Sequence, residues 1–341
     1  MLNIIWNKKN VEKQYKKKGA VKVKKALEKI KGVKVYDLKP EDLVKIVKES
    51  EKEDSFLIIG GHELFPFNEI DNPTNDGDVV VWTDNPYAST DNDPLLPERA
   101  IGRLPDGKDL DFLIIQIKKI EGTQEISSGR ENTCGLSAAV WKEASRNIYK
   151  IISDKKIILS PPETTDTIII DKNMEKLYFN LHGSKSTNKW YGQGEGRYPI
   201  ALSPDNIPKL KYSIVFTEAC YGAYIIDKEI SESLALTFLK AEAICFVGST
   251  TIAYGPPSPP ATEADLIASL FFQEILKGEN FGFALLNAKN EFFKIMIDRQ
   301  GFLDGNDKKT LLQFVLYGNP EDKLSHRYTE NTKKNEKLNK S

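Results

Sequence analysis

Cysteine and histidine are scarce in this chain, with three of each among 341 residues. Cys134, Cys220 and Cys245 lie far apart, so their spacing does not indicate a disulfide framework and fits a reducing compartment. No histidine has metal-ligand spacing to a cysteine, which argues against a structural zinc site. These rare side chains can act together only if the fold brings them together.

Long apolar runs and an excess of one charge are also lacking. No stretch of 18 apolar residues occurs, so no transmembrane helix is expected. The apolar start, residues 1–6, runs directly into lysines and is too short for a signal peptide, which predicts a cytoplasmic protein. The net charge of −1 favours neither nucleic acid nor a membrane surface as a partner. With 40% apolar and 28% charged residues, the composition is that of a globular protein with one large or two medium domains.

The beginning of the chain alternates short apolar runs with amphipathic segments. Strands are expected at 2–6, 33–38 and 55–59, with helices between them at about 11–30 and 40–50. This order predicts a parallel sheet with right-handed crossovers. Glutamates are interleaved with the lysines of the first helix, which favours a solvated helix face over a nucleic-acid patch.

The rest of the chain continues the α/β pattern. Further strands are expected at 79–83, 157–160, 176–181, 212–216, 243–247 and 311–317, and helices at about 108–120, 136–152, 231–240, 262–277 and 281–297. Thr262 and Asp265 predict a capping box at the start of one of these helices.

A polar stretch at about 121–130 separates two parts of the sequence. We therefore expect an N-terminal α/β lobe of residues 1–125 and a second, catalytic lobe of residues 126–324. The tail, residues 325–341, is polar and rich in lysine, which predicts disorder.

Six aspartates gather between Asp71 and Asp93, around the strand expected at 79–83. Carboxylate oxygens are suitable ligands for calcium. The ordered Asp-x-Asp-x-Asp-Gly spacing is missing, however, which favours a turn-rich surface loop. A structural calcium ion stays open as an alternative, and no other metal or cofactor is expected.

Two apolar, aromatic runs are followed by residues that suit nucleophilic catalysis. The run 176–181 stops at His182, and the run 212–216 is followed closely by Cys220. Chemistry in open α/β sheets lies just past the carboxyl ends of parallel strands. The two strands would therefore bring a thiol nucleophile and its proton-transfer partner to one edge. Either residue alone is more often a buried or hydrogen-bonded structural residue. Cys245, inside an expected strand, favours burial, and Cys134 stays open as a rival thiol.

Five short blocks, taken in order, resemble the gingipain-type cysteine peptidases, peptidase family C25 of the caspase-like clan. The blocks are Leu-Ile-Ile-Gly-Gly-His at 57–62, Ala-Ile-Gly-Arg-Leu at 100–104, Leu-His-Gly-Ser at 181–184, Phe-Thr-Glu-Ala-Cys at 216–220, and Gly-Ser-Thr at 248–250 with Phe-Val-Leu-Tyr-Gly-Asn-Pro at 314–320. The resemblance implies a caspase/gingipain-like three-layer sandwich with a mostly parallel sheet and two α/β lobes.

The resemblance also implies roles for individual residues. Cys220 would be the nucleophile of a cysteine endopeptidase, and His182 the general acid that protonates the leaving amine. The backbone N–H groups of Gly183 and Cys220 would form the oxyanion hole. Glu131 is the candidate for a third residue that orients the histidine.

Substrate recognition follows from the same resemblance. Asn180 and Glu218, each two residues before a catalytic residue, would line the pocket for the side chain before the cut bond, and Tyr254 would form its aromatic wall. A carboxylate at the pocket edge favours Arg or Lys by charge pairing. The expected partner is a protein or peptide substrate, with no role for nucleic acid or a membrane.

The chain departs from the family where Asn319 replaces the usual aspartate. No signal, pro-segment or sorting domain is visible, which suggests an intracellular enzyme held inactive until a partner or ligand binds. A catalytically silent, peptide-binding scaffold is the alternative reading. The α/β-hydrolase elbow, the phosphate loop and the dinucleotide-binding turn are missing, which argues against those enzyme classes.

Overall fold

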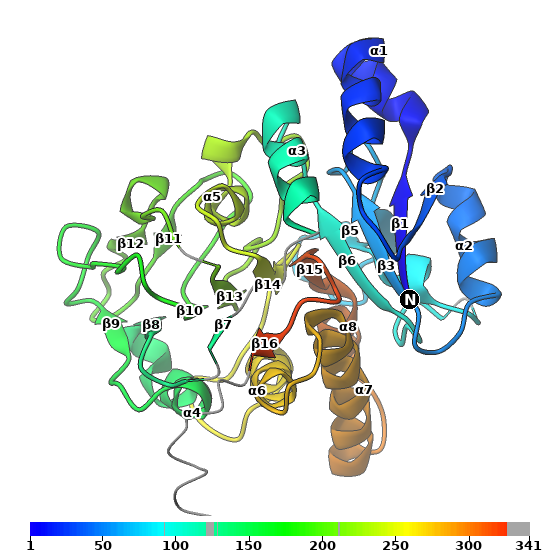
Figure 1. The fold of residues 1–341 in the computed structure, drawn as a ribbon. Helices are drawn as coiled ribbons and strands as arrows, with labels where there is room; N and C mark the ends of the chain where they lie inside the picture. Colours follow the sequence, from blue (N-terminus) through cyan, green and yellow to red (C-terminus); the bar gives the residue numbers. More distant parts are fainter. Residues whose placement is uncertain (92, 121–125, 128, 211, 326–341) are drawn as a thin grey trace, which may run out of the picture.

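A ten-stranded sheet forms the centre of the protein in the computed structural model (Figure 1). The structure describes residues 1–91, 93–120, 126–127, 129–210 and 212–325. In spatial order the strands are β2 (Lys34–Asp37), β1 (Leu2–Trp6), β3 (Ser55–Ile59), β6 (Ala100–Leu104), β15 (Phe314–Gly318), β14 (Cys245–Ser249), β13 (Ile214–Thr217), β10 (Lys176–Asn180), β8 (Thr133–Ala138) and β9 (Ile158–Ser160). Neighbouring strands are parallel except β14 and β15. The predicted α/β class with a mostly parallel sheet is confirmed.

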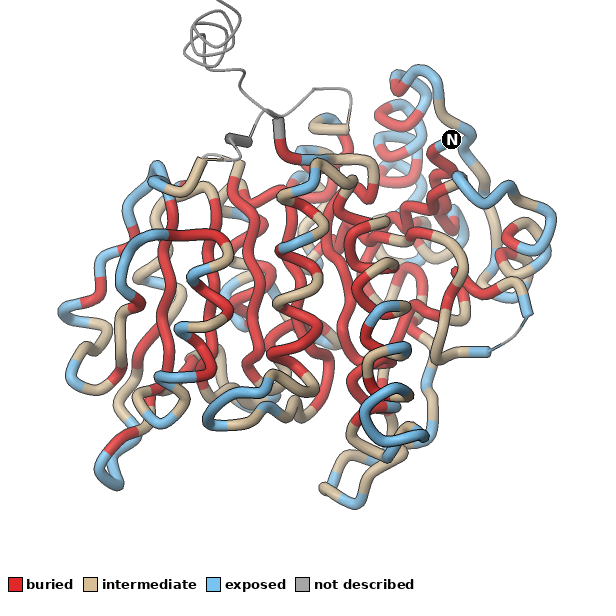
Figure 2. The backbone as a smooth tube through the Cα atoms, turned by 90° about the horizontal axis from the view of Figure 1, so that it is seen from below, coloured by how far each residue is buried: buried red, intermediate tan, exposed pale blue. Residues whose placement is uncertain are grey.

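Helices cover both faces of this sheet and complete three layers. One face carries α1 (Lys8–Leu27), α3 (Leu110–Lys119) and α5 (Leu234–Lys240). The other carries α2 (Pro40–Lys48), α4 (Lys142–Ile152), α6 (Glu263–Leu276) and α7 (Phe281–Gln300). Figure 2 shows buried backbone along the strands between these layers. Because both faces are covered, the central strands are buried at every position and mostly apolar, rather than alternating between apolar and polar residues.

Smaller elements surround the main sheet. Three two-stranded sheets pair β4 (Asn68–Asp71) with β5 (Val80–Thr83), β11 (Trp190–Tyr191) with β12 (Ile200–Leu202), and β7 (Ile126–Ser127) with β16 (Leu324–Ser325). Helix α8 (Gly305–Gln313) leads directly into β15. In the described residues, no helix has both the length and the apolar character needed to cross a bilayer.

The helix predicted at 136–152 is wrong over its first third. Residues Thr133–Ala138 form β8, which pairs with β10 and is buried along its whole length. The helix α4 begins only at Lys142. Small residues fill β8, and Gly135 lies against the ring of Tyr149, where a Cβ would come within 2.6 Å of the ring. Packing against α4 therefore decides the strand, and the short-range pattern gave no signal of it.

Three other predictions need correction. The strand predicted at 311–317 begins at Phe314, because the preceding residues form the last turns of α8. Thr262 does precede α6, but its side chain makes no capping hydrogen bond, so the predicted capping box is wrong. Ser325, assigned to the tail, pairs with Ser127. The rest of the tail, and the predicted lobe boundary at residue 125, lie outside the described residues.

Candidate active site

The sheet places His182 and Cys220 beyond the same ends of two neighbouring strands. Strands β10 and β13 run parallel, with Phe179 opposite Thr217. Past this register the backbone N–H of Glu218 still donates to the carbonyl oxygen of Phe179 at 2.9 Å. Two strands that end level with one another therefore deliver the imidazole and the thiol to one edge of the sheet.

The segments that follow these strands are in direct contact. A Cβ atom on Gly183 would lie 2.2 Å from the carbonyl oxygen of Cys220 and 3.3 Å from the Cβ of Ala219. Only glycine allows so close an approach of the two backbones. Gly183 therefore fixes the His182 segment against the Cys220 segment.

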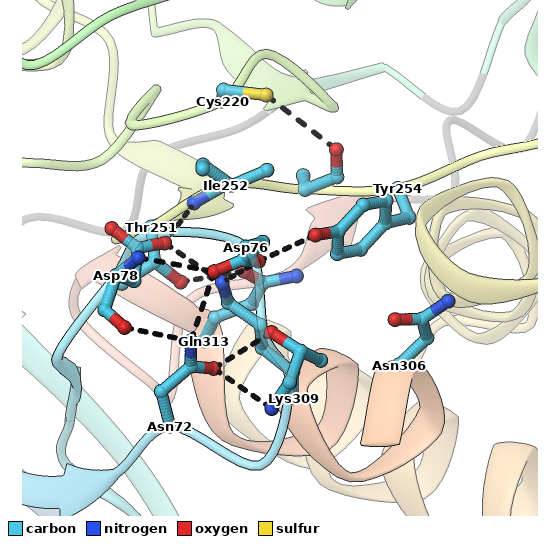
Figure 3. Close-up of polar contacts among 12 residues, drawn as sticks. Asn72, Asp76, Asp78, Cys220, Thr251, Ile252, Tyr254, Asn306, Lys309 and Gln313 are labelled. Carbon is cyan, nitrogen blue, oxygen red and sulfur yellow. Dashed lines mark hydrogen bonds and ion pairs between the residues drawn. The ribbon is translucent and has the colours of Figure 1, made fainter. Parts of the chain in front are cut away.

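The Cys220 thiol is partly exposed and points toward the loop after β14 (Figure 3). Its Sγ donates to the carbonyl oxygen of Ala253 at 3.5 Å. Burial raises the pKa of the Cys220 thiol, and the charge of Asp78 raises it further, while backbone hydrogen bonds and the charge of Lys309 act in the opposite direction. Because the net effect is a raised pKa, these surroundings favour the protonated thiol at neutral pH.

The His182 ring is held by an aromatic pair and an amide. The ring centroid of Trp141 lies 4.4 Å from that of His182, and the centroid of Tyr198 lies 5.5 Å from it. The Nε2 atom of His182 is 2.7 Å from Oε1 of Gln193. Since Nε2 of Gln193 donates to the Tyr198 hydroxyl at 2.8 Å, the amide oxygen is left to accept from the imidazole. Gln193 therefore orients the ring.

The backbone around His182 is anchored as well. His182 and Tyr191 of β11 exchange two backbone hydrogen bonds of 2.9 Å each. In the part of the chain that the structure describes, the thiol of Cys220 and the ring of His182 share no hydrogen bond. Catalytic contacts are often long without substrate and tighten only when substrate binds. The arrangement suits two groups that act on a substrate placed between them.

Glu131 does not lie at this edge of the sheet. It is exposed and precedes β8, whose first residue, Thr133, is opposite Lys176 at the beginning of β10. His182 follows the other end of β10. The structure therefore does not bring Glu131 to the imidazole, and Gln193 makes the contact predicted for it.

The two residues predicted to line the specificity pocket, Asn180 and Glu218, are both buried. The hydroxyl of Tyr178 donates to Oε1 of Glu218 at 2.7 Å. Burial and the neighbouring carboxyl of Asp265 raise the pKa of Glu218 well above its usual range, and burial likewise raises the pKa of Asp265. Glu218 is thus one half of a buried carboxyl pair at the end of β13 that holds its protons more tightly than free carboxyl groups do.

Tyr254, the predicted aromatic wall, lies in the loop that follows β14. Its hydroxyl donates to the carboxylate of Asp76 at 2.5 Å, and its ring faces the ammonium of Lys309 at 5.8 Å. Gly255, the next residue, would place a Cβ 3.2 Å from Asp265 Oδ2 and 3.9 Å from Glu218 Oε2. The predicted pocket residues Glu218 and Tyr254 therefore meet around one loop.

Comparison with known proteins identifies the family. The model of peptidase family C25 matches residues 21–325. The chain belongs to peptidase family C25. It is therefore a member of a family of cysteine peptidases, as the sequence blocks suggest. No curated protein sequence matches the chain.

Solved structures of similar fold agree with this membership. The Arg specific cysteine proteinase gingipain R is 15% identical, with a TM-score of 0.63 over 95% of this chain and 78% of that chain. A complex of the pro- and mature domains of RgpB from Porphyromonas gingivalis is 16% identical, with a TM-score of 0.62 over 95% and 79%. A third structure, described only as a protease, is 12% identical, with a TM-score of 0.58 over 95% and 78%. The C25 chain thus has the gingipain-type fold.

The remaining cysteines of this C25 peptidase are buried. Cys134 lies in β8 and Cys245 in β14, and burial raises the pKa of both thiols, that of Cys134 to about 11. Neither thiol reaches the strand ends at which His182 lies. Of the three cysteines, Cys220 is the partly exposed one, and it lies at the edge of the sheet where His182 also lies.

The aspartate-rich segment is not only a surface loop. Asp76 and Asp78 are mostly buried and form ion pairs with Lys309. In the described residues, no group of three or more His, Cys, Asp or Glu side chains is arranged to hold a metal ion. Sequence reasoning missed these pairings, as it missed Gln193, because neither belongs to a short motif.

Proposed function

We propose that this C25 peptidase cleaves peptide bonds with Cys220 as nucleophile and His182 as general acid. The observation that carries the proposal is the contact of Gly183 with the Cys220 backbone, since it joins the two strand ends at one edge. Membership of a cysteine peptidase family supports the same chemistry.

The residues fit a two-step hydrolysis. The thiol proton moves from Sγ to the imidazole of His182, and the sulfur attacks the carbonyl carbon of the bond to be cut. The backbone N–H groups of Gly183 and Cys220 stabilise the oxyanion. His182 then gives a proton to the leaving amine as the C–N bond breaks and a thioester forms. Water hydrolyses the thioester, which releases the carboxylic acid and restores the thiol.

The test is mass spectrometry of the products that the purified chain forms from a peptide library. Cys220→Ala and His182→Ala are expected to lower cleavage by at least about 10³-fold, because nucleophile and acid act as a unit. Cys134→Ala is the matched control, because it removes a thiol remote from His182 and should leave cleavage unchanged. Cleavage retained by Cys220→Ala would contradict the proposal.

The alternative is a scaffold that binds peptides without cutting them. Its prediction is that a peptidyl chloromethyl ketone binds without alkylating Cys220. Alkylation of Cys220, followed by peptide mass mapping, separates the two functions. The scaffold is supported only if the wild type forms no adduct and no product.

For the side chain before the cut bond we propose Arg or Lys. Glu218 and Asp265 have no cationic partner among the described residues. A basic substrate side chain bound beside them would favour ionisation of one carboxyl group and would then be attracted to it. Gingipain R is described as Arg specific. A peptide panel that varies only this residue tests the proposal, and a preference for Asp or Glu would reject it.

We also propose that the enzyme acts in the cytoplasm and needs an activating partner or ligand. Three free cysteines suit a reducing compartment. The Cys220 thiol has a raised pKa and donates a hydrogen bond to the carbonyl oxygen of Ala253, which supports an enzyme that is not yet active. Cell fractionation tests the location. Full turnover by the purified chain without any addition would contradict the need for an activator.

A further inference from the structure

A buried ion-pair cluster lies beneath the loops of the site (Figure 3). Lys309 of α8 has no exposed side-chain surface and pairs with Asp76 and, at 2.7 Å, with Asp78. Both aspartates come from the loop that joins β4 to β5. We call Asp76, Asp78 and Lys309 the acidic clamp. It brings together two segments that are more than two hundred residues apart in the chain.

Asp78 holds two loops of the site at once. Its Oδ1 accepts a 2.5 Å hydrogen bond from the hydroxyl of Tyr221, the residue directly after the nucleophile. Its Oδ2 accepts from the backbone N–H of Ile252 at 3.0 Å. Ala253, which follows Ile252, supplies the carbonyl that binds the Cys220 thiol. One carboxylate therefore fixes both the nucleophile segment and the loop that the thiol contacts.

Tyr221 has a backbone that needs such support. Its φ angle is 55°, a left-handed value that is unfavourable for a large side chain. Its N–H donates to the carbonyl oxygen of Thr251 at 2.8 Å, and its hydroxyl donates to Asp78. Strained residues of this kind persist where surrounding contacts hold them, often beside reacting groups. Because Tyr221 adjoins Cys220, its conformation sets the direction in which the thiol segment leaves β13.

Asp76, the remaining member of the acidic clamp, contacts Tyr254, the predicted wall of the substrate pocket. Asp76 accepts from the hydroxyl of Tyr254. Gln313, at the end of α8, accepts from the hydroxyls of Ser249 and Thr251 at 2.9 and 2.7 Å. The helix that carries Lys309 thus anchors the end of β14 and the first residues of the loop that follows it.

We propose that Asp78, neutralised by Lys309, is a positioning residue for Cys220, acting through Tyr221 and Ile252. The proposal rests on the proposed function of Cys220 as nucleophile. The clamp aligns the thiol with the carbonyl of a bound peptide, whereas a small reagent that diffuses to the sulfur does not need this alignment. The ratio of the two reaction rates therefore reports positioning separately from folding and from thiol reactivity.

The experiment measures alkylation of Cys220 in the full chain by two probes. The first probe is a tripeptidyl chloromethyl ketone, made in two forms with either arginine or leucine next to the reactive group. The second probe is iodoacetamide. The variants are Tyr221→Phe, which removes one hydroxyl and leaves the buried ion pairs intact, and Asp78→Asn. Asp71→Asn is the matched control, because Asp71 is exposed on the same hairpin.

Tyr221→Phe and Asp78→Asn should each lower the peptidyl-to-iodoacetamide rate ratio about tenfold or more, since small misplacements of reacting groups are costly. In the double variant the rate ratio should fall by much less than the product of the two single falls, because both changes act on the same hydrogen bond between Tyr221 and Asp78. Asp71→Asn should match the wild type. A ratio within twofold of the wild type in Tyr221→Phe would overturn the inference. If iodoacetamide labels wild-type Cys220 and neither peptidyl probe does, the proposed function fails instead.

Discussion

The two charges of one ion-pair cluster act on the pKa of the Cys220 thiol in opposite directions. Lys309 lowers its pKa and Asp78 raises it, but burial has the largest effect and raises it. The hydroxyls of Tyr221 and Tyr254 also face this region, and burial raises their pKa values, so they stay neutral. The charge state of the nucleophile therefore depends on how far a substrate or ligand changes its surroundings.

The raised pKa predicts how the free enzyme reacts with iodoacetamide. The rate of Cys220 alkylation should increase with pH, with a midpoint above the usual thiol value of 9, because only the thiolate reacts. Lys309→Met should shift the midpoint upward and Asp78→Asn downward, since these changes remove opposite charges. A rate–pH profile measured by mass spectrometry tests this. A wild-type midpoint below 8 would show that burial does not control the thiol.

At the residue scale, the sequence predicted the two catalytic candidates but not their supports. His182 and Cys220 stand next to apolar runs, and such runs mark strand ends. Gln193 lies in a loop between short strands, so no periodic pattern indicates that it meets His182. No pattern in the sequence fixes the position of Glu131 relative to His182, and the strand register places Glu131 at the opposite end of the sheet.

The contact between α6 and β13 places two carboxyl groups together in the interior. Asp265 comes from the helix and Glu218 from the residue after the strand, and both are more than nine-tenths buried. Burial raises both pKa values in the folded chain. The favourable contribution of the protonated pair is therefore complete below about pH 4, the ordinary range of both groups, and is lost as the pH rises to about 7 and beyond.

Replacing Glu218 by glutamine should remove part of this pH dependence. Relative to the wild type, the free energy of unfolding of Glu218→Gln should be about 2 kcal/mol higher, and the variant therefore more stable, at pH 8 than at pH 5, since each pKa unit corresponds to about 1.4 kcal/mol. Urea unfolding at both pH values measures it. Glu49→Gln, an exposed position at the end of α2, is the control and should show no such difference. Equal effects at both pH values would mean that Glu218 is ionised in the folded protein.

Element prediction failed where packing or a neighbouring element outweighed local pattern. Residues 133–138 have small side chains and no strand signal, yet β8 is fully buried between β10 and β9. Leu311 and Leu312 lengthen the apolar pattern ahead of β15 but belong to α8, which Asp304 caps through the N–H of Asp307. The sequence pattern therefore did not predict α8, and it gave no indication that Lys309 pairs with Asp76 and Asp78.

The two parts of the chain form one continuous sheet, and a buried ion pair stabilises their junction. Arg103 of β6 is opposite Tyr317 of β15, and its side chain has no exposed surface. Its guanidinium donates to both carboxylate oxygens of Asp84 at 3.0 and 2.5 Å and lies 4.1 Å from the centre of the Phe67 ring. The arginine of the block at 100–104 is therefore structural in this fold.

Breaking this pair should destabilise the whole molecule. Arg103→Met should lower the free energy of unfolding by about 3–5 kcal/mol, because Asp84 would be left buried without a partner. Adding Asp84→Leu should restore a large part of the loss, because the unpaired charge is then removed. Urea denaturation of the three chains at pH 7 measures both effects. A loss below about 1 kcal/mol in Arg103→Met would show that water reaches Asp84.

The fold as a whole was more predictable than the site. Strand–helix alternation indicates a parallel sheet from the sequence alone, but the cluster at the site joins segments near residues 76, 221, 252 and 309. These contacts are made only after the chain is folded, and no short motif records them.

The position of β15 determines when this enzyme can exist during synthesis. In the described part of residues 1–325, β15 follows all of its partners in the main sheet along the chain, yet it lies between β6 and β14 in the middle of the sheet. Until residue 318 leaves the ribosome, the nascent chain holds two half-sheets whose open edges can pair wrongly. A premature stop just before β15 should therefore yield an insoluble product rather than a smaller working protease.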